Sequence, residues 1–151
     1  MQFRTLARVA AVAAVAVVGA WQTPVFAAAS VSNGKLSCTV TSLLPTLSKT
    51  SLTAKATVSC TAPTTASVSI ALSEYDGAIE QAIQTPRKVS VAVTKARTNY
   101  SVSGSTMTCV NTETGNEEYV SKVQVTLTTS TGALVTSSWD IRLPTNDAHA
   151  C

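Results

Sequence analysis

A Ser–His–Asp catalytic set needs a histidine that takes the proton from the nucleophile. This chain of 151 residues contains a single histidine, His149, with Asp147 as its nearest acidic neighbour. Both lie in a polar segment at the end of the chain, which does not hold an imidazole in one fixed orientation. No G-x-S-x-G nucleophile elbow is present in the sequence. We therefore expect no catalytic residue of this type.

Two groups of carboxylates offer another route to catalysis, because paired acids serve as general acid and base in glycosidases. Glu74 and Asp76 flank Tyr75, and Glu117 and Glu118 are adjacent. Both groups lie at predicted hairpin ends, where acidic side chains keep loops solvated. We therefore expect no enzyme activity and no cofactor. A small carboxylate-dependent hydrolase remains as an alternative.

The cysteines Cys38, Cys60, Cys109 and Cys151 carry the main covalent signal of the sequence. They contain no C-x-x-C pair, and one histidine does not complete a zinc-ligand cluster, so we expect no metal site. Four cysteines in an exported chain predict two disulfides. Cys38 and Cys60 each lie on the apolar side of a predicted strand, which favours the pairs Cys38–Cys60 and Cys109–Cys151. The alternative pairs Cys60 with Cys109 and Cys38 with Cys151.

Residues 1–29 have the pattern of a signal peptide that is cleaved on export. Arg4 and Arg8 give the positive start, and an apolar run of alanine and valine follows that is too short to span a bilayer comfortably. Small residues predict cleavage after Ala27 or Ala29. The sequence therefore predicts a secreted, extracellular protein, and an uncleaved amino-terminal anchor is the alternative.

Residues 30–151 are expected to form one domain, because a chain of about 120 residues buries a single core. Removal of Arg4 and Arg8 with the signal leaves 9 basic and 8 acidic residues, a net charge of +1. So small a charge does not favour nucleic acid or an acidic membrane as a partner. We therefore expect no nucleic acid and no membrane contact after cleavage.

Alternating apolar and hydroxylated residues fill the mature chain, most clearly over residues 51–61 and 66–75. A period of two places one set of side chains on each face of a pleated strand. About seven to nine such segments, separated by frequent turn signals, predict an all-β, antiparallel β-sandwich. Asp76 and Gly77 predict a hairpin turn, and residues 78–85 are expected to form the returning strand.

Three further boundaries are predicted from residues that interrupt the alternation. Pro45 cannot donate to a ladder, so residues 43–50 are expected to connect two strands. Gly104 is expected to turn the chain between two short strands. A last strand over residues 135–143 is expected to point Trp139 into the core, in phase with its apolar neighbours.

This architecture resembles immunoglobulin-like sandwiches, and the resemblance implies two facing sheets with loops at both ends. Two positions differ from true immunoglobulin domains. Met107 stands two residues before Cys109, where those domains place a tyrosine. The strand that contains Ile70 and Leu72 lacks their tryptophan. The chain also resembles the small, Ser/Thr-rich, disulfide-bonded exported proteins of bacteria, and neither resemblance transfers a functional residue.

A small basic group surrounds one predicted strand, with Arg87 and Lys88 at its start and Lys95 and Arg97 after its end. Basic charges at an edge strand oppose its pairing with other chains. The segment from Gln81 to Lys88 is also exposed and basic in character. A secreted protease inhibitor that presents this segment is therefore the second functional hypothesis.

The lack of a catalytic set, together with two predicted disulfides, favours a non-catalytic binding or interaction module. Its ligand, an unknown protein or glycan, is expected at strand edges or at the loops over residues 74–86 and 111–118. The possible ligand-loop residues are Glu74, Tyr75, Asp76, Arg87, Lys88, Glu117 and Glu118.

Overall fold

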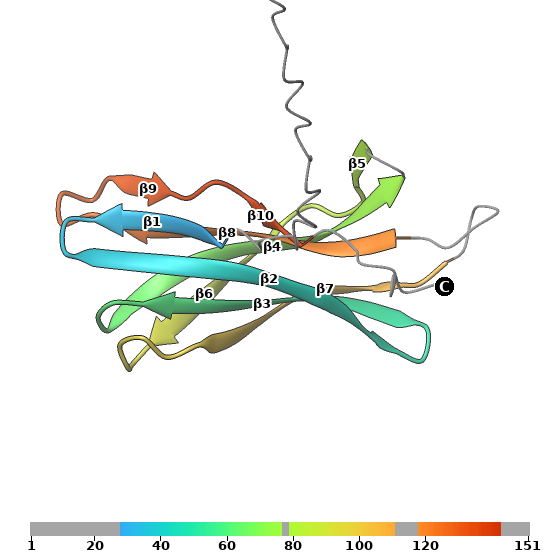
Figure 1. Ribbon diagram of the computed structural model, residues 1–151, viewed down its shortest axis with the longest axis horizontal. Coiled ribbons are helices and arrows are strands. Elements are labelled where there is room, and N and C mark those ends of the chain that lie inside the picture. The colour runs from blue at the N-terminus through green and yellow to red at the C-terminus, as the bar shows by residue number, and fades with distance from the viewer. Residues whose placement is uncertain (1–27, 77–78, 111–117, 143–151) are drawn as a thin grey trace, which may run out of the picture.

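The computed structural model describes residues 28–76, 79–110 and 118–142, which form an all-β sandwich of two antiparallel sheets (Figure 1). The predicted signal up to residue 27, and the tail from residue 143 with His149 and Cys151, lie outside these ranges. The strands of the described part are β1 (Ala29–Asn33), β2 (Leu36–Ser48), β3 (Ser51–Cys60), β4 (Thr64–Asp76), β5 (Ile79–Ala82), β6 (Arg87–Val93), β7 (Tyr100–Thr108), β8 (Glu118–Thr128), β9 (Leu134–Thr136) and β10 (Asp140–Ile141).

The first sheet has the order β1-β2-β3-β7, and the second sheet is built around β4 and β8. β5 and β6 pair with the free edge of β4, and β9 and β10 pair with the free edge of β8. The chain passes from one sheet to the other after β3, β6 and β7. Its connections therefore gather at the two ends of the sandwich (Figure 1).

The core lies between the two sheets and is made by the alternation that the sequence predicts. In β3 every second residue is buried, as expected for a strand with one face on the core. Burial of one such valine, leucine or isoleucine stabilises the fold by roughly 1.5–3 kcal/mol. The largest fully buried side chains of the three central strands include Leu52 and Val58 of β3, Ile70 and Leu72 of β4, and Val123 and Val125 of β8.

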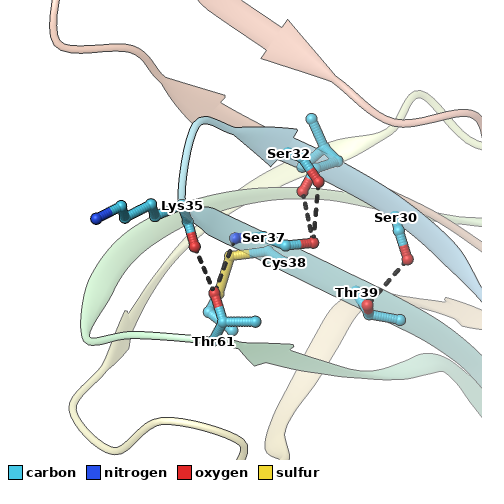
Figure 2. The surroundings of a disulfide bond; sticks show 9 residues. Ser30, Ser32, Lys35, Ser37, Cys38, Thr39 and Thr61 are labelled. Carbon is cyan, nitrogen blue, oxygen red and sulfur yellow. Dashed lines mark hydrogen bonds between the residues drawn. A yellow bond between two sulfur atoms is a disulfide. The ribbon is translucent and has the colours of Figure 1, made fainter.

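The Cys38–Cys60 disulfide closes one end of this core and confirms the predicted pairing. The two cysteines are direct partners in the β2–β3 register, and their Cα atoms lie 4.1 Å apart. Thr61 continues the ladder beyond them, because its N–H donates to the Ser37 carbonyl. The return bond from the Ser37 N–H goes to the Thr61 hydroxyl instead of a carbonyl (Figure 2).

The second predicted disulfide, Cys109–Cys151, lies partly outside the described residues, because Cys151 is not described. None of the described cysteines is free. The Cys38–Cys60 bond indicates that the protein folds in an oxidising environment.

One predicted boundary in the first sheet is wrong. β2 runs through Pro45 instead of ending before it, because the β2–β3 register shifts between Leu43 and Thr46. Such a bulge interrupts the ladder, so a residue that cannot donate is tolerated there. β1 begins at Ala29, inside the predicted signal, and pairs with β2.

Gly104 does not form a turn. β7 is continuous from Tyr100 to Thr108, and Gly104 lies at a buried position in its middle. A Cβ atom at Gly104 would lie 3.0 Å from the Ala54 Cβ and 3.4 Å from two side-chain carbons of Ile70. Glycine is therefore needed here because the neighbouring strand β3 and the facing strand β4 both approach closely, and not because the chain reverses.

The predicted last strand is broken into β9 and β10, and the break reverses its inward face. The Ser137 N–H donates to the Val125 carbonyl at 2.9 Å, but the Val125 N–H donates to the Ser137 hydroxyl at 3.1 Å. The same hydroxyl donates to the Ser138 carbonyl at 2.7 Å. After this break Asp140 is buried, whereas Trp139 lies half-buried beside the side chain of Lys122. The expectation that Trp139 joins the core is therefore wrong.

Among the described residues, two hydrogen bonds to buried side chains cross between the sheets. Asp140 Oδ2 accepts from the Ser42 N–H at 2.6 Å, and Ser121 Oγ accepts from the Lys55 N–H at 2.9 Å. Both accepting side chains are buried, and both donors lie next to a register shift of their strand. Buried polar groups of the second sheet thus satisfy backbone donors of the first, where the ladder is irregular.

Candidate functional site

Tyr75 and Glu118, two of the predicted ligand-loop residues, lie side by side on the outer face of the second sheet. Tyr75 of β4 pairs with Glu118 of β8 on one side and with Glu80 of β5 on the other. Directly opposed residues of antiparallel strands share a face of the sheet. The structure therefore brings together side chains from three strands that are distant in the sequence.

Of the other predicted acids, Glu74 does not join this row. Glu74 pairs with Tyr119, whose side chain is buried, so Glu74 and Glu118 point to opposite faces of the sheet. Asp76 ends β4, and Glu117 lies outside the described residues. Glu74 and Glu118 thus do not form the paired carboxylates that a glycosidase requires.

A cluster of Ser73, Glu80, Lys122 and Trp139, here called the Lys122 cluster, lies next to this row. The Lys122 ammonium donates to Glu80 Oε1 at 2.7 Å, and the Ser73 hydroxyl donates to the same oxygen at 2.9 Å. The Lys122 Nζ lies 5.1 Å from the centre of the Trp139 ring, which is a cation–π distance. The Lys122 and Glu80 side chains are 21% and 23% exposed, so both charges are partly withdrawn from water.

The protonation states of this region follow from its geometry. Burial alone would raise the pKa of the Glu80 carboxyl, but hydrogen bonds from Lys122 and Ser73 and the Lys122 charge outweigh it and lower that pKa from its usual 4.5. Burial and the Glu80 charge raise the pKa of the Tyr75 phenol above its usual 10.0. At neutral pH the region therefore presents a carboxylate, an ammonium group and a neutral phenol.

Sequence reasoning missed Glu80, Lys122 and Trp139. Lys122 carries a usable signal, because it alternates with the inward Val123 and Val125 of β8 and so belongs to the outer face. No such signal exists for Trp139, because the break before β10 reverses the phase of the last strand.

Arg87 and Lys88 lie apart from this region, at the start of the edge strand β6. Both are exposed, and they pair with Ile70 and Ser69 of β4. The preceding segment is not a freely projecting loop. Its first residues belong to β5, and Ile83 packs against the core.

The described residues hold no group of three or more His, Cys, Asp or Glu side chains that is arranged to bind a metal ion. No helix in the described ranges is long and apolar enough to cross a membrane. Comparison with protein-family models, with curated protein sequences and with solved structures finds no match to this chain.

Proposed function

We propose that this protein is a secreted, non-catalytic binding module that holds a protein or glycan ligand against the Lys122 cluster. The position of Trp139 carries this proposal, because its ring lies half-buried over the Lys122 ammonium on the outer face. Tyr75 adds a second ring on that face, and Glu80 and Lys122 supply an acceptor and a donor. Oriented aromatic rings give large contact areas at small entropic cost, and ligand sites often use them.

Secretion is part of the same proposal. The buried Cys38–Cys60 disulfide supports it, since such bonds persist in oxidising compartments. The signal peptide over residues 1–29 remains a prediction from the sequence.

We further propose that the sandwich is immunoglobulin-like in its strand order. β2, β3 and β7 correspond to strands A, B and E, and β4, β8 and β9–β10 to strands C, F and G. β5 and β6 extend the second sheet beside β4, as the additional strands of variable-type domains do beside strand C.

Tyr119 supports this assignment. It lies at the second position of β8, and its hydroxyl donates to the Val110 carbonyl at 3.2 Å. Immunoglobulin domains have such a tyrosine at the start of strand F, two residues before the second cysteine of their inter-sheet disulfide. Here Ser121 takes the cysteine position, and its hydroxyl accepts from the Lys55 N–H of β3. A cross-sheet hydrogen bond thus stands where those domains have a covalent link, and Cys38–Cys60 joins neighbouring strands instead.

The pairing of Cys109 with Cys151 also stays a proposal. Cys109 follows the end of β7 and is not free, which is consistent with a bond to the tail. A bond of this kind would attach the end of the chain to the first sheet.

The test of the binding proposal compares the native protein with the Trp139→Ala, Glu80→Gln and Leu47→Ala variants. Each is applied to a glycan array and, with cross-linking, to proteins of the surrounding medium. We expect a ligand of the native protein to be lost with Trp139→Ala and weakened with Glu80→Gln. Leu47→Ala is the control, because Leu47 is 39% exposed on β2 in the other sheet. The proposal is overturned if the native protein has no ligand, or if none of its ligands is lost with Trp139→Ala.

A further inference from the structure

One end of the sandwich carries an unbalanced positive charge. The connections at this end contain Lys35, Lys95 and Arg97 and no acidic residue. These connections follow β1, β3, β6 and β8 and gather at one end of the molecule (Figure 1). They consist of residues 34–35, 61–63, 94–99 and 129–133. We call the three basic residues the basic end.

The three basic side chains are accessible and form no ion pair with a described acid. Lys35, Lys95 and Arg97 are all exposed. Figure 2 shows the Lys35 side chain extending away from the strands. The ion pair of the described residues, Lys122–Glu80, belongs to the Lys122 cluster on the outer face of the second sheet. The basic end therefore keeps its full charge for an external partner.

Hydrogen bonds hold the backbone of the basic end in place. The Arg97 N–H donates to the Cys60 carbonyl at 2.7 Å, and the Thr61 hydroxyl donates to the Lys35 carbonyl at 3.3 Å. Both loops are thus attached to the strand end that carries the disulfide. The Tyr100 hydroxyl accepts from the Lys95 N–H at 2.7 Å and closes the loop before β7. A pre-ordered loop loses little entropy when it binds a ligand.

The surroundings of the three charges favour a sugar polymer over other polyanions. Threonine hydroxyls at positions 61, 94, 98, 129 and 131 lie on the same connections. Hydroxyl groups complement sugar hydroxyls, whereas single-stranded nucleic acid needs aromatic rings on which its bases stack. Tyr100 is the aromatic residue nearest in sequence, and its side chain packs against the core.

We propose that the basic end binds an acidic polysaccharide, with Lys35, Lys95 and Arg97 contacting its carboxylate or sulfate groups. The small net charge of the mature chain is compatible with this proposal, because the basic end lies apart from the described acids. Among the described acids, Glu74, Asp76, Glu80 and Glu118 lie at the opposite end of the second sheet, and Asp140 is buried. The proposal is independent of the Lys122 cluster.

The experiment measures retention of the secreted protein on immobilised heparin as salt is raised, together with dissociation constants for polygalacturonate and dextran sulfate. The test variant carries Lys35→Gln, Lys95→Gln and Arg97→Gln. The control carries Lys49→Gln, Lys88→Gln and Arg87→Gln, which removes the same side-chain types at other exposed positions. Thermal melts verify that both variants are folded.

We expect the test variant to bind on the order of tenfold more weakly at low salt and to depend less steeply on salt, because fewer counterions are released. The control is expected to bind as the native protein does. The carboxylated and the sulfated probe then identify which anion is preferred. Equal weakening of the control, or no salt-dependent retention of the native protein, would overturn the proposal. Tighter binding to single-stranded DNA or to phosphatidylglycerol vesicles through the same three residues would overturn the assignment to a glycan.

Discussion

Individual side chains decide how closely strands and sheets pack, and Gly104 is a point of close approach. We expect Gly104→Ala to destabilise the fold by roughly 1–3 kcal/mol, because its new methyl group would press on Ala54 and Ile70. Urea unfolding measures the loss, and Ser101→Ala at an exposed position of the same strand is the control. The double variant with Ala54→Gly should lose less stability than the two single changes together. A double variant that loses as much stability as the two single variants together would contradict the close approach of Gly104 and Ala54.

The hydrogen bond between Asp140 and Ser42 leads to a second prediction, which compares variants of the two residues. Asp140→Ala should cost about 1–3 kcal/mol, because it leaves the buried Ser42 N–H without its acceptor. Asp140→Asn keeps an oxygen acceptor and should cost less. The Ser42 hydroxyl is buried and has no hydrogen-bond partner among the described residues, so Ser42→Ala should change stability by no more than about 0.5 kcal/mol. Equal losses from Asp140→Ala and Ser42→Ala in the same unfolding assay would contradict this account.

The Glu80 carboxylate predicts a pH dependence of stability. Because its pKa is lowered in the folded protein, its contribution is fully present above the usual value of 4.5 and disappears as the pH falls through the folded pKa. Glu80→Gln should therefore reduce stability at pH 7 and have progressively less effect as the pH falls below about 4.5. Melting temperatures of both proteins between pH 7 and pH 3 measure this difference. A constant difference over that range would rule out the ion pair as its cause.

At the scale of elements, the regular strands were predictable and the irregular ones were not. The alternation in β3 and β4 identifies their buried faces directly, and the register of Cys38 with Cys60 follows from that phase. Pro45 and Gly104 were misread, and the last strand was predicted without its break, because the backbone at each of these places depends on a group on another strand. A bulge, a close approach or a hydroxyl in place of a ladder carbonyl leaves no local pattern in the sequence.

The candidate site, too, was predictable where its strands are regular and not where they are irregular. Tyr75 and Glu118 were predictable as surface residues near hairpin ends, although their pairing across β4 and β8 was not. Trp139 was assigned to the core because regular alternation was extended through a break. The site therefore depends on the one segment where the period of two fails.

The position of β1 leads to a prediction of where the signal peptide is cleaved. Ala29 is buried and pairs with Val40, so cleavage after Ala29 would remove the first residue of β1. Cleavage after Ala27 leaves the whole strand in the mature protein. We therefore expect the intact mass of the secreted protein to correspond to a chain that starts at Ala28. A chain that starts at Ser30 would show that the buried Ala29 is dispensable.

At the scale of the whole molecule, covalent and charged groups divide the sandwich into different regions. One end has the buried Cys38–Cys60 bond and the basic end, and the outer face of the second sheet has the Lys122 cluster. The Cys38–Cys60 bond joins residues 22 positions apart. In the chain-entropy model, a disulfide that closes a loop of this length stabilises the folded protein by about 3 kcal/mol. The rigid interior thus supports two separate surfaces, and each can be altered without touching the core.

Peptide mapping of the secreted protein without reduction tests the central claim most directly, namely an exported sandwich joined covalently within its first sheet. We predict one linked peptide pair that contains Cys38 and Cys60 and a second that contains Cys109 and Cys151. A peptide that links Cys60 to Cys109, or free thiols in the secreted protein, would contradict the account.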